Sequence, residues 1–385
     1  MRFNSTVFQQ FLKLVPRSTF NQLAKKHHSG RALRSMTRWS QFIALSFAQI
    51  TGRKSLRDIE LGLQSHQQSL YHLGGRLVKR SSLARVNEKQ SYLFYRDLFG
   101  HLYQQCQAQA PRHNFNFDHK LYSLDASVID LSLKLFPWAK CSQHKAAVKL
   151  HLGLDHDGLI PAVAVVTDGS VADSTIAPTL DFPQGSIVVV DRGYHDFSWF
   201  KSLTGNGVFF VTRLKSKVKY DTISVQEALP GSDVESDAMI QLTGIRAQKL
   251  VMPKLRRVIT VCPITRIRYV FLTNAMHLDA QVIADLYKAR WEVELFFKWI
   301  KQNLKIKWFI GTSKNAVLTQ IWSALCVNLL IAFLTFCSKT HHSMQQVLRL
   351  LSVTFFHRME MYSLVRGDIG YGPPTKHSPQ LSMGF

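Results

Sequence analysis

The apolar segment at residues 317–337 limits the fold of this chain more than any other feature. A helix of this length could cross a bilayer, which takes about 20 residues. The segment also contains Gln320, Ser323 and Asn328, and the chain has no second apolar run of comparable length. We therefore predict that it is the buried core helix of a folded domain. A single membrane span is the alternative.

The charge of the chain indicates the chemistry of its partner. The 385 residues include 48 Lys and Arg against 25 Asp and Glu, which gives a net charge of +23. Hydrophobic residues make up 46% of the chain, which is enough to bury a core and excludes global disorder. A basic excess of this size on a folded protein indicates a polyanion, either nucleic acid or an anionic membrane surface. More than half of the excess lies within residues 1–110.

The cysteines and the N-terminal residues indicate the compartment. The five cysteines are scattered and lack metal-ligand spacing, so we expect neither a disulfide framework nor a structural zinc site. The first 20 residues lack an apolar stretch followed by a small-residue cleavage site, so we expect no signal peptide. Both observations predict a reduced, cytoplasmic setting.

The basic N-terminal region has the pattern of helices. Ser55 precedes a helical pattern over residues 56–63, and Ser81 or Ser82 is placed to cap a basic helix within residues 80–89. Two capped helices around a Gly-Gly turn resemble a helix-turn-helix, whose second helix enters the major groove of DNA. A basic helical bundle with a solvated face is the alternative. The side chains that we expect to contact DNA here are Arg76, Lys79, Arg80 and Arg85.

The pattern changes to strands from about residue 118. We predict a short strand that ends at Asp125, a hairpin over residues 147–166, and a buried strand that ends at Asp191. Three meandering strands followed by strands separated by helices are the order of a ribonuclease-H-like α/β core. Residues 213–275, with patterns that include 246–252, predict a β-rich insertion into this core. The predicted fold class is therefore an α/β core interrupted by a β-rich insertion and preceded by an all-helical domain.

A long helix predicted over residues 279–304 carries a narrow polar stripe. At 100° per residue, five functional side chains share an arc of about 80° on an otherwise largely apolar helix. They are Tyr287, Arg290, Glu294, Lys298 and Lys301. This pattern favours a lined functional site. The alternative is a set of i,i+4 salt bridges, which contribute only tenths of a kcal/mol.

Three carboxylates are candidate metal ligands. Asp125 and Asp191 are each predicted to end a strand, and such positions converge on one cleft in open α/β sheets. Together with Glu294 they supply the hard oxygen donors that Mg²⁺ or Mn²⁺ prefers. Two ions about 3.5–4 Å apart would suit phosphodiester chemistry. Arg290, Lys298 and Lys301 would then hold phosphates.

The spacing Tyr287-x₂-Arg290-x₃-Glu294-x₆-Lys301 resembles the Y-x₂-R-x₃-E-x₆-K signature of DDE transposases in bacterial insertion-sequence family four. The residues around Asp125 and around Asp191 are similar to the two catalytic Asp segments of that family. The β-rich insertion is also in the family's position. The resemblance implies catalytic roles for the two Asp residues and Glu294.

The resemblance also implies a reaction and its partners. Such enzymes bind terminal inverted repeats, pair two DNA ends as a dimer, cut by metal-dependent hydrolysis and join the ends to target DNA, with a hairpin intermediate. By analogy Tyr287 and Arg290 would hold distorted phosphates, and Trp291 would either stack on an extruded base or be buried in the core. We expect a nucleoid-associated cytoplasmic protein with no membrane partner. We predict a DNA-binding domain over residues 1–115, a catalytic domain over 116–340 and an extension over 341–385.

Other acids and another function are also compatible with the sequence. Asp155, Asp157, Asp168 and Asp173 lie in predicted turns or loops, where Asp is common for backbone reasons, and we do not expect them to bind metal. We do not expect His195 to be a required base, and Glu292 should point away from the stripe. The alternative function is a non-catalytic DNA-binding protein or an inactive copy of an insertion element.

Overall fold

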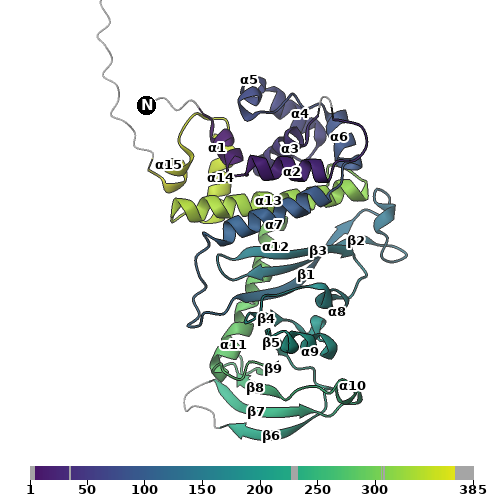
Figure 1. Ribbon diagram of the computed structural model, residues 1–385, viewed down its shortest axis with the longest axis vertical. Helices are drawn as coiled ribbons and strands as arrows, with labels where there is room; N and C mark the ends of the chain where they lie inside the picture. Colours follow the sequence, from purple (N-terminus) through teal and green to yellow (C-terminus); the bar gives the residue numbers. More distant parts are fainter. Residues whose placement is uncertain (1–4, 34–35, 227–232, 305, 307, 369–385) are drawn as a thin grey trace, which may run out of the picture.

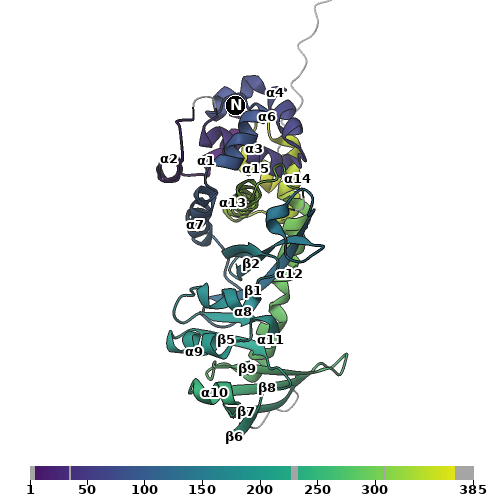
Figure 2. The ribbon, with the colours of Figure 1, turned by 90° about the vertical axis from the view of Figure 1, so that its right-hand side faces the viewer.

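The computed structural model describes residues 5–33, 36–226, 233–304, 306 and 308–368. Figure 1 shows three parts along the long axis: a group of helices at one end, the long helix α13 (Lys314–Ser338) below them, and a sheet that continues to the other end. Figure 2 shows this order from the side.

The described part of the first 110 residues is mostly helical, as predicted. Their elements are α1 (Val7–Lys13), α2 (Arg17–Lys26), α3 (Arg38–Thr51), α4 (Leu56–Gln64), α5 (Gln67–Leu70), η1 (Tyr71–Leu73), α6 (Arg80–Lys89) and α7 (Leu93–Gln107). The Ser55 hydroxyl caps α4 by accepting a hydrogen bond from the Asp58 N–H, as predicted. The predicted Ser81 or Ser82 cap of α6 is wrong. This helix already begins at Arg80, because the Leu83 N–H bonds the Lys79 carbonyl, so both serines lie inside its first turn.

One nine-stranded sheet contains the predicted core. Its order is β3-β2-β1-β4-β5-β9-β8-β7-β6. The strands are β1 (Leu121–Leu131), β2 (Ala146–Asp155), β3 (Ile160–Asp168), β4 (Ile187–Val190), β5 (Phe209–Arg213), β6 (Tyr220–Gln226), β7 (Val234–Leu242), β8 (Leu255–Val261) and β9 (Arg268–Thr273). The antiparallel run β1–β3 followed by parallel β4 and β5 is the predicted ribonuclease-H-like arrangement. The α/β fold class is therefore confirmed.

The region between β5 and the long helix pair continues the same sheet. β9 pairs antiparallel with β5, so β6–β9 extend the core sheet. The expectation of a strand over residues 246–252 is wrong, because the structure has the short helix α10 (Ile245–Lys249) there. Ala247 is buried while Arg246, Gln248 and Lys249 face solvent. One buried side chain among exposed neighbours suits a single helical turn better than a strand with one buried face.

Two helices run along the sheet where one was predicted. They are α11 (Ala280–Ala289) and α12 (Trp291–Asn303), with a break at Arg290. The Val293 N–H bonds the Arg290 carbonyl, an i to i+3 bond that tightens the turn at the break. α11 contacts β4 and β5, and α12 contacts β1 and β2, so the pair places its side chains beside the parallel strands.

The apolar segment forms α13 and is a core helix, as predicted. Its most apolar 18-residue window is 94% buried inside the protein. It packs against α3, α6 and α7, against β3, and against the C-terminal helices α14 (Met344–Thr354) and α15 (Met361–Arg366). The N-terminal helices, α13 and the C-terminal helices share one hydrophobic core, so described residues of all three predicted segments, 1–115, 116–340 and 341–385, meet in common packing. This three-domain division stays a prediction.

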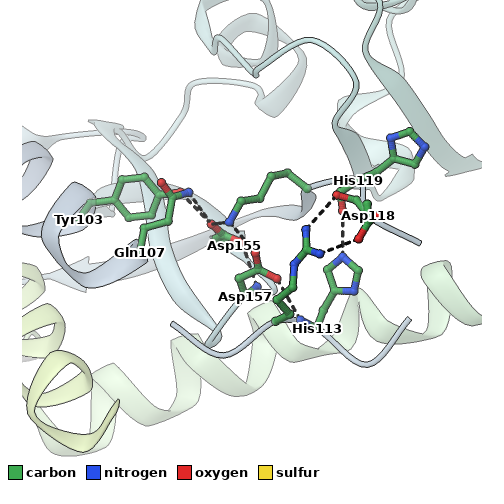
Figure 3. Close-up of polar contacts among 9 residues, drawn as sticks. Tyr103, Gln107, His113, Asp118, His119, Asp155 and Asp157 are labelled. Atoms are coloured by element: carbon green, nitrogen blue, oxygen red, sulfur yellow. Dashed lines mark hydrogen bonds and ion pairs between the residues drawn. The ribbon is translucent and has the colours of Figure 1, made fainter. Parts of the chain in front are cut away.

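A polar cluster ties α7 and the segment before β1 to the sheet (Figure 3). Asp155 is fully buried and accepts hydrogen bonds from Tyr103 Oη at 2.8 Å and Gln107 Nε2 at 3.1 Å. Asp157 pairs with Lys120 and accepts a bond from the His113 N–H at 2.9 Å. Burial opposes ionisation of Asp157, but these partners lower its pKa. The structure therefore gives both acids structural partners.

Candidate active site

The parallel pairing of β1 and β4 brings two of the predicted carboxylates together. Leu124 on β1 is paired with Val190 on β4, so the next residues, Asp125 and Asp191, lie side by side. The prediction that Asp125 ends its strand is wrong. β1 continues to Leu131 because it keeps pairing with β2, whereas β4 stops at Val190. Asp191 is therefore the first residue after β4, whereas Asp125 lies within β1.

The third carboxylate comes from α12 and is joined to the first by an arginine. Arg290 Nη2 lies 2.7 Å from Glu294 Oε1, and Arg290 Nη1 lies 3.9 Å from Asp125 Oδ2. The Arg290 side chain is only 12% exposed. The guanidinium therefore lies between a carboxylate on the helix and one on the sheet.

Burial and the neighbouring charges shift the pKa values of Asp125 and Arg290. Burial raises the pKa of Asp125 to about 6, and the charges of Asp191 and Glu294 act in the same direction. The Ala126 N–H and Arg290 oppose this shift. For Arg290, burial opposes the charged form, but the hydrogen bond to Glu294 and the charge of Asp125 outweigh it and raise its pKa. A cation bound beside Asp125 would favour the ionised form of this carboxylate.

The donor set is suited to a hard divalent cation. All three side chains supply oxygen. In the parts of the chain that the structure describes, no group of three His, Cys, Asp or Glu side chains is close enough to hold one ion alone. Mg²⁺ is commonly held by only one or two carboxylates together with substrate phosphates and water, so an all-protein cage is not required.

Comparison with known proteins identifies the family. Residues 116–330 match the model of the transposase DDE domain, and residues 3–76 match a domain of unknown function. A protein of Sinorhizobium fredii that is named as a transposase is 34% identical over 266 residues, which cover 66% of this chain and 73% of that protein. The chain belongs to the DDE transposases. It is therefore a DNA-cutting and DNA-joining enzyme of a mobile element.

Two further relatives carry insertion-sequence names. A Geobacillus stearothermophilus protein named as an insertion-sequence transposase is 27% identical to this transposase. The alignment covers 66% of this transposase and 67% of the Geobacillus protein. A Synechocystis protein with a similar name is 23% identical to this transposase. The alignment covers 75% of this transposase and 82% of the Synechocystis protein. A solved synaptic complex of piggyBac transposase with hairpin DNA aligns with 96% of this chain and 81% of that one, at 11% identity and a TM-score of 0.42.

The basic side chains of the stripe have different surroundings in the transposase. Lys301 Nζ donates to Ser127 Oγ at 2.5 Å and to the Val128 carbonyl at 2.9 Å, which ties α12 to β1 just beyond Asp125. Lys298 is exposed to solvent. The Tyr287 ring packs on Phe271, with the Arg290 guanidinium 5.5 Å from its centroid. The stripe therefore contacts β9 through Tyr287 and β1 through Lys301, and Lys298 between them faces solvent.

Trp291 and the N-terminal basic residues are at the surface. Trp291 is 57% exposed, so the alternative that it is buried in the core is wrong. The side chains of Arg76, Lys79, Arg80 and Arg85 are also exposed. They lie on or just before α6, which Figure 1 places on the far side of α13 from the sheet.

Sequence reasoning missed Arg213 and gave Asp173 no role near the carboxylates. Arg213 ends β5, the strand next to β4. Its charge lowers the pKa of Tyr287, whereas the charge of Asp191 raises it. The rule that strand ends converge would have found Arg213. Asp173 approaches Asp191 from a separate one-turn helix, and no pattern in the sequence indicates this.

His195 packs on Phe197 and Phe200, and burial lowers its pKa to about 4.

Proposed function

We propose that Asp125, Asp191 and Glu294 are the catalytic carboxylates of a cut-and-paste transposase. The observation that carries the proposal is that the buried Arg290 contacts Asp125 on β1 and Glu294 on α12, while the register of β1 and β4 places Asp191 beside Asp125. A salt-bridged surface helix would not need a buried guanidinium between two elements. The family membership supplies the reaction class.

The carboxylates would hold two divalent ions, Mg²⁺ or Mn²⁺. When bound, such ions activate the attacking water or 3′-hydroxyl and stabilise the leaving oxygen of a phosphodiester. Arg290 would exchange part of its contact with Glu294 for a phosphate oxygen, since its Nε lacks a hydrogen-bond partner within the described part of the chain. The exposed Lys298, with Lys301 and Tyr287, would contact the flanking phosphates. The exposed Trp291 could stack on an unpaired base.

The helical region would bring the DNA ends to this site. Exposed basic residues on and before α6 would contact the terminal inverted repeats: Arg76, Lys79, Arg80 and Arg85. Two copies of the chain would pair two ends before cleavage, and the cut ends would pass through a hairpin before they join target DNA. Binding of this kind weakens steeply with salt, because phosphate contacts release counterions.

The test compares Glu294→Gln with Glu292→Gln on DNA that carries the element's own ends. Both substitutions remove one carboxylate from α12, but Glu292 lies on another face, beside Trp299 and Asn328. We expect Glu294→Gln to bind this DNA like the wild type and to lose Mg²⁺-dependent cleavage, whereas Glu292→Gln keeps both.

Other outcomes would point to the alternative function. If the wild type binds the ends but never cuts them in Mg²⁺ or Mn²⁺, the chain is a non-catalytic DNA-binding protein or an inactive copy. If Glu294→Gln still cuts, the assignment of Glu294 is wrong while the enzyme activity stands.

A further inference from the structure

A fourth carboxylate lies beside Asp191. Asp173 begins the one-turn helix α8 (Asp173–Ile176), which packs against η4 (Arg192–Tyr194), the turn directly after Asp191. A Cβ atom on Gly193 would lie 2.9 Å from Asp191 Oδ1 and 3.1 Å from Asp173 Oδ2. Because each oxygen is about 3 Å from the same point, the two are within about 6 Å of each other, where like charges interact strongly.

Lys149 supplies the counter-charge for Asp173. Its Nζ lies 3.2 Å from Asp173 Oδ1 and donates to the Val171 carbonyl at 2.9 Å. The Lys149 side chain on β2 is 15% exposed, so water screens this pair only partly. His151 Nδ1 is 3.6 Å from the same oxygen, but burial lowers the pKa of this imidazole to about 4, and it is neutral at pH 7. Lys149 is therefore the cation that faces Asp173 at neutral pH.

The same contacts hold the turn that orients Asp191. The Gly193 N–H donates to Asp191 Oδ1 at 2.6 Å. Tyr194 is fully buried in the core below this turn, and its hydroxyl lies 3.5 Å from His151 Nδ1. Asp173 lies against the turn at Gly193, where a larger side chain would meet both carboxylates. The direction of the Asp191 carboxylate thus depends on α8 as well as on β4.

We propose that the Asp173–Lys149 pair is a positioning pair for Asp191, which fixes its carboxylate and sets the charge around it. This inference rests on the proposed function, in which Asp191 binds a divalent cation. Asp173 adds a negative charge close to the cation position, and Lys149 offsets it from the other oxygen of the carboxylate. Removing the negative charge of Asp173 should therefore lower the cation affinity, and removing the positive charge of Lys149 should raise it.

The experiment measures the affinity of the full-length protein for Mn²⁺ in two ways. The first is the Mn²⁺ concentration that gives half of the rise in Tm. The second is the concentration that gives half-maximal cleavage of DNA carrying the element's ends. We expect Asp173→Asn to raise both concentrations about tenfold, as for other residues that orient metal ligands. We expect Lys149→Met to lower the Tm-based concentration, and the double variant to lie closer to wild type than either single variant.

Matched controls separate this role from a structural one. Lys149→Arg keeps the charge and should resemble the wild type, and Asp221→Asn removes an exposed carboxylate on β6 at the far edge of the sheet. A purely structural pair would give single variants that shift Mn²⁺ affinity in the same direction, or not at all, and either result overturns the inference. If Asp191→Asn keeps the full Mn²⁺-dependent rise in Tm, the proposed metal site fails instead.

Discussion

Replacing Asp125 with Asn tests whether this carboxylate is held at a cost to stability. The side chain is 21% exposed, and burial, aided by the charges of Asp191 and Glu294, raises its pKa from 3.8 to about 6. This difference corresponds to about 3 kcal/mol of unfolding free energy. The Ala126 N–H that bonds Asp125 Oδ1 can still bond the side-chain oxygen of an Asn.

The sign follows from the two protonation states. Above pH 6 the Asp125 carboxyl is ionised in the folded and unfolded chains, so the folded protein carries the full cost. Below pH 3.8 it is protonated in both, and the cost vanishes. The contribution of Asp125 to the unfolding free energy is thus most favourable in acid, and this contribution is lost as the pH rises through about 6. Asp125→Asn should raise the unfolding free energy by about 3 kcal/mol at pH 7.5 and by about half of that at pH 5.

Urea denaturation in EDTA, followed by tryptophan fluorescence at both pH values, measures this difference. Asp130→Asn, at an exposed position on the same strand, is the control and should change stability little. Adding Mg²⁺ should stabilise the wild type but not Asp125→Asn. The reasoning is refuted if Asp125→Asn is no more stable than the wild type at pH 7.5, or if its advantage does not depend on pH.

Three further predictions concern other parts of the protein. Arg256→Met leaves Asp237, whose Oδ2 lies 2.6 Å from Arg256 Nη2, buried without its cation and should lower the unfolding free energy by about 3–5 kcal/mol in denaturant titrations; a loss below about 1 kcal/mol would contradict this. The double variant Arg80→Gln/Arg85→Gln should reduce the salt dependence of DNA binding by about two phosphate contacts, and an unchanged slope would remove both residues from the interface. Leu325→Ala, at a 1% exposed position in α13, should cost about 2–5 kcal/mol by calorimetry, which a helix outside the core would not show.

Local patterns predicted much of the candidate site. The 3.6-residue period placed Arg290 and Glu294 on one helix face, and the structure joins them at 2.7 Å across one turn. The buried strand before Asp191 was evident from its run of β-branched residues. These features are predictable because hydrophobic periodicity and strand propensity act over a few residues.

Other features depend on partners far away in the chain. β1 runs past Asp125 because β2 continues to pair with it, and no residue near Asp125 encodes that length. Trp291, the first residue of α12, is exposed although its residue type favours burial. The stripe alone could not show either result, because burial is set by neighbouring elements.

The sequence by itself determined most of the elements, the basic charge of the helical region and the spacing of Tyr287, Arg290, Glu294 and Lys301, because each follows from residue type and short-range period. The tertiary structure alone decided which acids meet. Asp155 and Asp157 pair with Lys120, whereas Asp173 comes to lie beside Asp191 across Gly193. Asp155 ends β2, Asp157 lies in the turn after it and Asp173 begins α8, and the packing of distant segments decides which partners each acid meets.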